Sequence, residues 1–177
     1  HHIAGPYATK LLADFGANVI KVEPLGGDIA RQLGPFQGNQ PHPEKSGTFF
    51  FLNTNKRSVV LNLKTAAGRE ALAALARKAD LVVESFAPGT MDRLGVGYDF
   101  FRAINPSLPL VSISNFGQTG PYRDYRLTDL TLYAFAGEMY SMGETDREPV
   151  KMAGTAALIE SGAAAAAAAM GAIFASK

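Results

Sequence analysis

The sequence predicts an α/β fold in which short parallel strands alternate with helices that cover both faces of an open sheet. Runs rich in Val, Ile and Leu alternate with segments whose apolar residues recur at helical spacing. Gly and Pro separate these segments and mark their ends. Consecutive parallel strands need a helix between them, and right-handed crossovers place such helices on both sides of the sheet.

The predicted elements follow one another from a first helix. Tyr7, Leu11 and Phe15 lie on one helical face, and Gly16 ends that helix. Helices are predicted at residues 5–15, 64–79, 98–104, 129–139 and 152–175. Strands are predicted at residues 18–24, 58–63, 80–86 and 108–116. Residues 25–57 contain several Gly, Pro and Asn and are predicted to be a loop, whose length suggests a functional role.

Length and composition restrict the class of protein. A chain of 177 residues with 47% apolar residues can bury one core, so we expect one globular unit. The formal charge of +1 argues against nucleic acid and an anionic membrane surface as partners. Because the chain has no cysteine and its three histidines form no zinc motif, we expect neither a disulfide nor a metal site. This composition fits a cytoplasmic enzyme.

The two ends of the chain carry further information. The sequence begins at His1 without a methionine, which favours a fragment of a longer protein. Residues 152–175 are the most apolar stretch, but they contain Glu160, glycines and mostly alanine. This composition is too weakly hydrophobic to favour a membrane span, so we expect a buried helix.

In an open parallel sheet, ligands bind beyond the carboxyl ends of the strands. In this chain the predicted strands end near Glu23, Leu63, Phe86 and Phe116, so the segments that follow these residues are the candidate ligand-binding segments. In the first segment, Gly26 and Gly27 let backbone amides approach an anion, and Arg31 can pair with a phosphate. The sequence contains neither a Gly-x-Gly-x-x-Gly motif after a strand nor a Walker lysine motif, so a standard dinucleotide site is not supported.

Cations and an aromatic residue lie near the next strand ends. Lys56 and Arg57 precede the second strand, and Lys64 closes it. A cation at the start of a helix opposes the helix dipole, which favours a ligand-binding role for Lys64. After the third strand, the ring of Phe86 can stack on adenine and Arg93 adds a positive charge. Each of these residues, taken alone, also fits an ordinary core or surface position.

Four sequence blocks, taken together, resemble the class III CoA-transferase family, which includes formyl-CoA transferase, carnitine CoA-transferase and α-methylacyl-CoA racemase. The blocks are GPYATKLLADFGANVIKVEP, NKRSVVLNLK, ESFAPGTMDRLG and SNFGQTGPY. The resemblance implies a Rossmann-like fold in which residues 1–177 form the N-terminal part of a large CoA-binding domain. It also places a further strand before His1 and a small domain after Lys177, and it implies two chains interlocked as a homodimer.

The resemblance implies a site for CoA at the strand ends, with acyl-CoA and a carboxylic acid as substrates and with no metal. The residues that match the family's CoA contacts are Arg31, Leu61, Lys64, Ser85, Phe86 and Arg93. Ser85 stands where the family often has asparagine. His2, Ile3 and Ala4 match the family's first loop, which lines the pocket.

The family's nucleophile is an aspartate four residues before a glycine in the last helix. Gly162 matches that glycine, so Leu158 stands at the expected position of the aspartate. Glu160 is an alternative candidate, but two residues along a helix correspond to about 200° of rotation, so Glu160 is expected to point away from the site. The resemblance therefore suggests a copy without its own nucleophile, as in relatives with two transferase-like halves of which one keeps the acid.

Three other functions remain open at this stage. A racemase would move a proton next to the thioester with an acid/base pair, and that branch also expects an aspartate near position 158. A non-enzymatic CoA-binding half would stabilise an active partner. A plain nucleotide-binding Rossmann domain lacks support because the glycine motif is missing.

Overall fold

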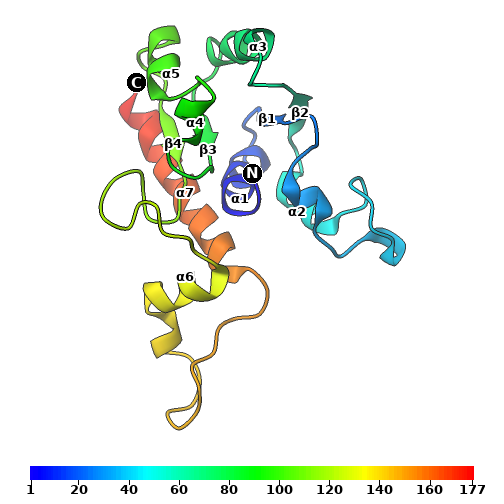
Figure 1. Cartoon of the computed structure of the whole chain (residues 1–177), viewed down its shortest axis with the longest axis vertical. Helices are drawn as coiled ribbons and strands as arrows, with labels where there is room; N and C mark the ends of the chain where they lie inside the picture. Colours follow the sequence, from blue (N-terminus) through cyan, green and yellow to red (C-terminus); the bar gives the residue numbers. More distant parts are fainter.

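The computed structural model describes all 177 residues and confirms the four predicted strands and five predicted helices. The α-helices are α1 Ala4–Asp14, α2 Gly47–Asn53, α3 Ala66–Ala76, α4 Thr90–Arg93, α5 Tyr98–Ile104, α6 Asp129–Ala136 and α7 Ala156–Ala175. The strands are β1 Ile20–Glu23, β2 Arg57–Val60, β3 Val82–Glu84 and β4 Leu110–Ser112 (Figure 1). Single 3₁₀ turns span Ile29–Gln32, Gln37–Asn39 and Glu138–Tyr140.

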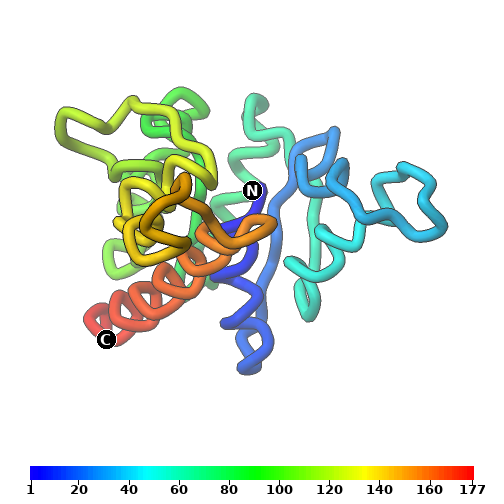
Figure 2. The backbone as a smooth tube through the Cα atoms, turned by 90° about the horizontal axis from the view of Figure 1, so that it is seen from below, coloured from blue at the N-terminus to red at the C-terminus, as the bar shows by residue number.

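The four strands form two separate parallel pairs. Strand β1 pairs with β2, from Ile20 opposite Arg57 to Glu23 opposite Val60. Strand β3 pairs with β4, from Val82 opposite Leu110. No hydrogen bond joins the two pairs, and α1 lies between them in both views (Figures 1 and 2). The α/β class is therefore confirmed. The strand expected before His1 stays a prediction.

The predicted loop at residues 25–57 contains a helix, α2, that was not predicted from the sequence. Helix α2 begins after Ser46, whose side chain accepts a hydrogen bond from the amide of Phe49. Ser46 also donates to the carbonyls of Ala30 and Leu33, so this cap fastens α2 to the turn before it. The sequence did not predict this helix because its run of three phenylalanines shows no amphipathic pattern over such a short length.

Helix α7 packs along α1, and a glycine fixes how closely the two helices approach (Figure 1). A Cβ atom at Gly162 would lie 2.7 Å from the carbonyl oxygen of Ala4 and 3.1 Å from the Cβ of Tyr7. Any larger residue would push the helices apart. Gly162 thereby sets which α7 residues face the start of α1, and this register decides where residue 158 lies.

By length and hydropathy, α7 could also cross a membrane. The most apolar stretch of 18 residues in α7 has a mean hydropathy of 1.6, and 22% of that stretch is buried in the structure. The buried residues are Ala157, Gly162, Ala166 and Ala169, which recur at helical spacing. Because this face packs against α1, we interpret α7 as a core helix with one face still uncovered.

Apolar packing is concentrated in two small clusters. The first joins Ile3, Ala30 and Leu52, and Leu158 packs against it. The second is built around Phe101, between α3, α5 and the start of β4. Only 23 of the 177 residues are buried, so much apolar surface stays open; Phe174, for example, is 85% exposed.

Candidate functional site

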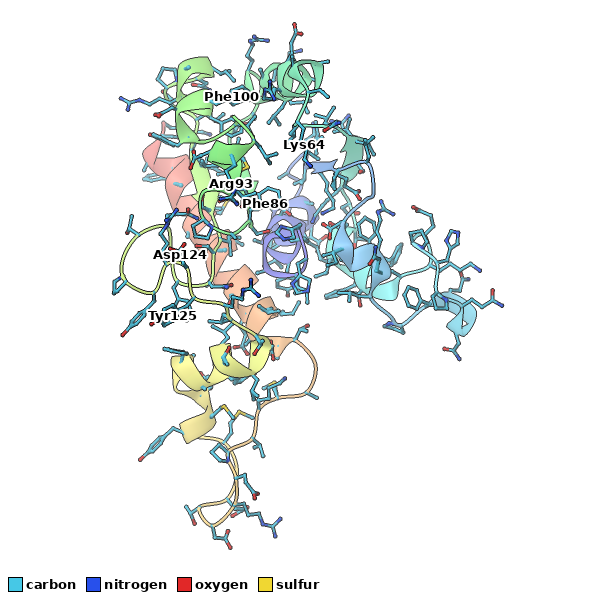
Figure 3. All side chains as sticks on the ribbon, in the orientation of Figure 1. Lys64, Phe86, Arg93, Phe100, Asp124 and Tyr125 are labelled. Atoms are coloured by element: carbon cyan, nitrogen blue, oxygen red, sulfur yellow. The ribbon has the colours of Figure 1, made fainter.

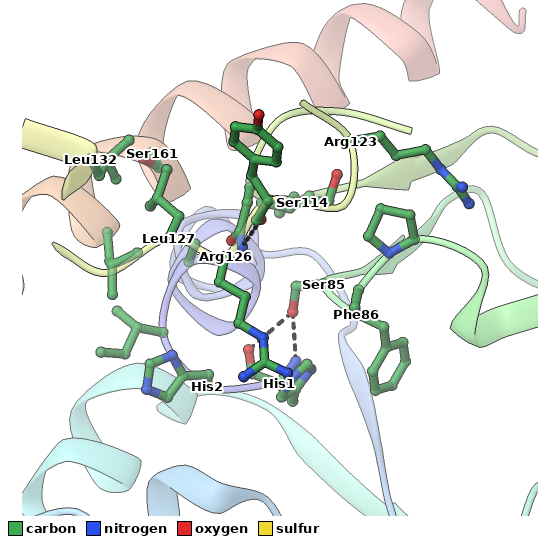
Figure 4. A pocket seen from close by; sticks show the side chains of 18 of the residues that line it. His1, His2, Ser85, Phe86, Ser114, Arg123, Arg126, Leu127, Leu132 and Ser161 are labelled. Carbon is green, nitrogen blue, oxygen red and sulfur yellow. Dashed lines mark hydrogen bonds between the residues drawn. The ribbon is translucent and has the colours of Figure 1, made fainter. Parts of the chain in front are cut away.

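A cavity of about 550 Å³ opens beyond the carboxyl ends of β3 and β4 (Figure 4). Its wall is formed by residues 1–4, 85–88, 113–115 and 123–127 together with Ile29, Leu132, Leu158 and Ser161. The cavity therefore lies where α1 begins, where the two strands end and where α7 makes its first turn. This is the edge of the strands at which the sequence analysis predicted a ligand site.

The two ends of the cavity differ chemically. Leu127 and Leu132 form an apolar end, whereas Arg123 and Phe86 lie toward the other side in Figure 4. The long side chain of Arg126 extends between these ends, toward Ser85. Such a cavity suits an elongated ligand that has anionic groups at one end and an acyl group at the other.

Position 158, where the family aspartate is expected, is part of the cavity wall. Leu158 is half-buried there, and its amide donates a 3.3 Å hydrogen bond to Oδ1 of Asp129. Glu160 is exposed and does not line the cavity, in agreement with the rotation expected from helical geometry. The structure therefore does not bring Glu160 to this site.

Two other carboxylates lie near the cavity without taking the place of that aspartate. Asp129 does not line the cavity, and its Oδ2 lies 2.8 Å from the Nζ of Lys151 in a partly buried ion pair. The angle at that contact does not meet hydrogen-bond geometry, so the pair is electrostatic. Asp124 does line the cavity, but its side chain is 80% exposed. Neither carboxylate combines burial with an open path to a ligand.

Ser85 and Phe86, two of the predicted CoA-contact residues, lie in the cavity wall. The buried Glu84 accepts a 2.7 Å hydrogen bond from the amide of Phe86 and fixes the turn after β3. The Phe86 ring stacks on the ring of His1 at 4.8 Å between centroids, so one of its faces is suited to planar partners. Ser85 can sit above α1 because Gly5 lacks a Cβ, which would lie 2.5 Å from its Oγ.

Arg31, predicted to contact CoA, is instead held by carboxylates of its own chain. Its Nε and Nη2 donate to Glu23 at 2.8 and 3.0 Å, and its Nη1 donates to Glu44 at 2.8 Å. The guanidinium also lies 3.7 Å from the centroid of the Phe49 ring. Arg31 does not line the cavity. As placed here, it stabilises the turn after β1 rather than facing the cavity.

The carboxylate at the end of β1 carries the strongest electrostatic perturbation in this turn. Burial alone would raise the pKa of Glu23, but hydrogen bonds from Arg31, from Ser58 and from the Asp28 amide outweigh it and lower the pKa to about 2. Asp28 in turn accepts from the amides of His2 and Ala30. This chain of hydrogen bonds ties the turn after β1 to the first residues of the cavity wall.

The remaining predicted CoA-contact residues lie outside the cavity. The amide of Leu61 donates to the carbonyl of Glu23 at 3.0 Å and extends the β1–β2 pairing. Lys64 is exposed just beyond β2, and Arg93 lies at the end of α4 (Figure 3). The Nη2 of Arg93 donates to the Oγ1 of Thr90 at 2.8 Å. The structure thus brings Ser85 and Phe86 into the cavity and leaves Arg31, Leu61 and Lys64 on the β1–β2 side.

Residues 123–127 contribute a part of the wall that was not predicted from the sequence. These residues follow the SNFGQTGPY block, and they include Arg123 and Arg126 within four positions. Two arginines in a loop after a strand end were a usable signal, since the strand-end rule points to that loop. The structure contains no group of three or more His, Asp or Glu side chains suited to a metal ion.

Comparison with known proteins finds relatives that are named as CoA-transferases. The chain is 44% identical to acetyl-CoA:oxalate CoA-transferase from Acetobacter aceti, over 88% of this chain and 39% of that protein. It is 42% identical to succinyl-CoA:mesaconate CoA-transferase from Haloarcula marismortui, over 85% of this chain and 39% of that protein. The chain thus spans about two fifths of the length of these curated relatives.

A solved structure and a family model agree with these relatives. A CAIB/BAIF family protein from Brucella suis superposes with a TM-score of 0.88 at 36% identity, covering 98% of this chain and 46% of that one. The model described as CoA-transferase family III matches residues 1–177. The chain, matched from end to end, belongs to CoA-transferase family III.

Proposed function

We propose that this chain forms the CoA-binding part of an enzyme that transfers CoA from an acyl-CoA to a carboxylic acid. The family supports the reaction class, and the cavity supports the ligand class because it joins a basic end to an apolar end. The relatives are named for oxalate and mesaconate, among other acids, so the acceptor acid stays open.

Covalent CoA transfer needs a carboxylate that can reach the thioester carbonyl. The carboxylate would attack that carbonyl and form a mixed anhydride, releasing the CoA thiolate. The thiolate would then attack the enzyme's own carbonyl, freeing the first acid and leaving an enzyme-bound CoA thioester for the acceptor acid to resolve. Leucine has no group for either step, and Leu158 occupies the cavity wall at the matching position.

We therefore propose that this copy binds CoA without performing the covalent step itself. The observation that carries this proposal is the position of Leu158 in the cavity wall, with Gly162 against Ala4 fixing the register of α7. The active carboxylate would come from a second transferase-like domain or another subunit. In that arrangement the present chain positions CoA or stabilises its partner.

The test uses the complete protein that carries this chain, incubated with an acyl-CoA and digested for mass spectrometry. We expect no CoA adduct on peptides that contain residues 154–162. An adduct on Glu160 would show that this copy has its own nucleophile and would refute the proposal of a silent site. Titration calorimetry with CoA is run on the same sample, because absence of binding would remove the CoA-binding part of the proposal.

The racemase alternative is separated by a different measurement. A racemase would exchange the α-proton of its acyl-CoA with solvent, so deuterium from D₂O would enter the substrate without CoA transfer. This alternative draws no support from the cavity, since the position that would supply the acid or base is Leu158. Incorporation of deuterium would assign the racemase reaction in place of CoA transfer.

The assembly and location of the protein are also proposals. A homodimer, or a second transferase-like domain, would cover the exposed apolar side chains, of which Phe15 is 92% and Phe174 is 85% exposed. Light scattering on the complete protein tests the homodimer. We propose the cytoplasm as its location, on the absence of cysteine alone, and subcellular fractionation tests it.

A further inference from the structure

The buried side chain of Asp28 is bonded to a segment that forms part of the cavity wall. Asp28 does not itself line the cavity, whereas the next residue, Ile29, and residues 1–4 do (Figure 4). Its Oδ1 accepts a hydrogen bond from the amide of Ala30 at 2.9 Å and another from the amide of His2 at 3.2 Å. One carboxylate oxygen therefore joins the turn after β1 to the residues that precede α1.

The backbone of His2 has a conformation that needs such a bond. Its φ is 66°, in the left-handed region that residues other than glycine seldom adopt. A residue keeps this conformation only where its surroundings hold it there. Helix α1 does not supply the hold, because its N-cap residue Ile3 makes no side-chain hydrogen bond to the helix. The contact that fixes the His2 amide is therefore the one with Asp28.

The carboxylate of Asp28 is itself held firmly. Its side chain is 2% exposed, and its Oδ2 pairs with the Nζ of Lys21 on β1. Burial alone would raise the pKa of Asp28, but the hydrogen bond and the charge of Lys21 outweigh burial and lower that pKa. The amide of Asp28 donates to Oε2 of Glu23 at 3.0 Å. Asp28 is thus an ionised acceptor at neutral pH, fixed at both its backbone and its side chain.

Ser46 supports the same turn and provides a comparison within this chain. Its Oγ donates to the carbonyl of Ala30 at 2.9 Å, whereas Asp28 binds the amide of that residue. Both side chains are buried. Ser46 makes no hydrogen bond to residues 1–4, so it supports the turn without fixing His2. If Asp28 only stabilised the turn, the loss of either residue would affect the cavity in the same way.

We propose that Asp28 is a positioning residue, which keeps His2 in its left-handed conformation and thereby sets the shape of the cavity wall at residues 1–4. Asp28 acts through the backbone, since it does not line the cavity. The inference rests on the proposed CoA-binding function and adds a residue outside the predicted contact set. When the bond to His2 is lost, only a fraction of the molecules keeps the binding conformation, and the apparent Kd rises by the reciprocal of that fraction.

The test compares two variants of the complete protein, both without the ion pair to Lys21. The first, Asp28→Asn with Lys21→Met, keeps an oxygen acceptor for the His2 amide. The second, Asp28→Ser with Lys21→Met, keeps a good cap for the turn but is one bond too short to reach His2 as well. In titration calorimetry with CoA, we expect a Kd close to that of the wild type for the first variant and about 10-fold higher for the second. Ser46→Ala is the control, and it should keep the wild-type Kd although it loses hydrogen bonds in the same turn.

Hydrogen exchange of the ligand-free protein, measured by mass spectrometry, reports on the wall without any ligand. Peptides that contain residues 1–8 should exchange faster in the second variant than in the first, and Ser46→Ala should leave their exchange at the wild-type rate. If the wild type binds no CoA, the proposed function fails and the exchange rates alone decide this inference. Equal exchange at residues 1–8 in the two variants would overturn it.

If the wild type binds CoA, the affinities give a second decision. Equal Kd values for the two variants would overturn the inference. A Kd for Ser46→Ala that rises as far as that of the second variant would overturn it too, because the stability of the turn would then be the cause. If the second variant does not melt like the first, Asp28→Thr with Lys21→Met replaces it, since threonine is also a short helix cap, and the same rise in Kd is expected.

Discussion

Replacing Glu23 with glutamine would test the hydrogen-bond network that holds the turn after β1. Glu23 is 2% exposed, and it accepts hydrogen bonds from Arg31 Nε at 2.8 Å, Arg31 Nη2 at 3.0 Å and Ser58 Oγ at 2.6 Å. Glutamine keeps the size of the side chain and one oxygen acceptor. It removes the negative charge and turns a second acceptor into an N–H donor that faces the guanidinium.

The expected loss follows from the pKa of Glu23. The structure lowers that pKa from 4.5 to about 2, although burial alone would raise it. Because one pKa unit corresponds to about 1.4 kcal/mol, the folded state favours the ionised carboxylate by roughly 3 kcal/mol. Removing one partner of a buried ion pair costs about 3–5 kcal/mol in other proteins. At pH 7 we therefore expect Glu23→Gln to lower the free energy of unfolding by about 3 kcal/mol.

The pH dependence gives a second, independent check. A carboxylate with a depressed pKa in the folded state contributes fully above its unfolded pKa, here 4.5. That contribution is lost as the pH falls from 4.5 through about 2. The stability gap between the wild type and Glu23→Gln should therefore close across this range, because the variant has no carboxyl group to protonate.

Urea unfolding of the complete protein at pH 7 and at several values down to pH 3 measures this gap. The control is Glu70→Gln on α3, since Glu70 is exposed and its side chain forms no ion pair, and it should change stability by less than about 0.5 kcal/mol. A gap of less than about 1 kcal/mol at pH 7, well below the cost of breaking a buried pair, would refute the reasoning. A gap that stays constant down to pH 3 would do the same.

Three further predictions concern the site and its support. Leu158→Asp should create a CoA adduct on its own peptide where the wild type has none, as measured by mass spectrometry; an unmodified peptide would mean that the cavity does not bring the thioester to this position. Burial lowers the pKa of Lys56 to about 7, so the folded state binds fewer protons than the unfolded state between that pH and 10.5. Wild-type stability should therefore rise with pH above 7 and Lys56→Met should lack that rise in urea unfolding; parallel curves would contradict this. Gly162→Ala should cost about 1–3 kcal/mol in thermal unfolding, because its Cβ would meet the carbonyl of Ala4, whereas Gly171→Ala, with open space around it, should be neutral or stabilising.

Local sequence patterns were sufficient for most of the secondary structure. Helix α5 has the bounds that its pattern predicted, residues 98–104, and each predicted strand overlaps an observed one. These elements were predictable because periodicity and Gly or Pro boundaries act over a few residues. The pattern failed at α2, where Ser46 supplies the cap but three consecutive phenylalanines show no face. It also could not give the strand pairing, which depends on residues far apart in the chain.

By itself, the sequence determined the α/β class, the family, the edge at which the cavity lies and the leucine at position 158. Only the tertiary structure decided which side chains face that cavity. Arg31 looked free in the sequence, yet the fold places Glu23 and Glu44 beside it. Arg123 was not predicted, although it follows a strand end, and the fold places it in the cavity wall. The physical reason is that charges are paired or left unpaired by distances between separate elements, and a linear sequence does not contain those distances.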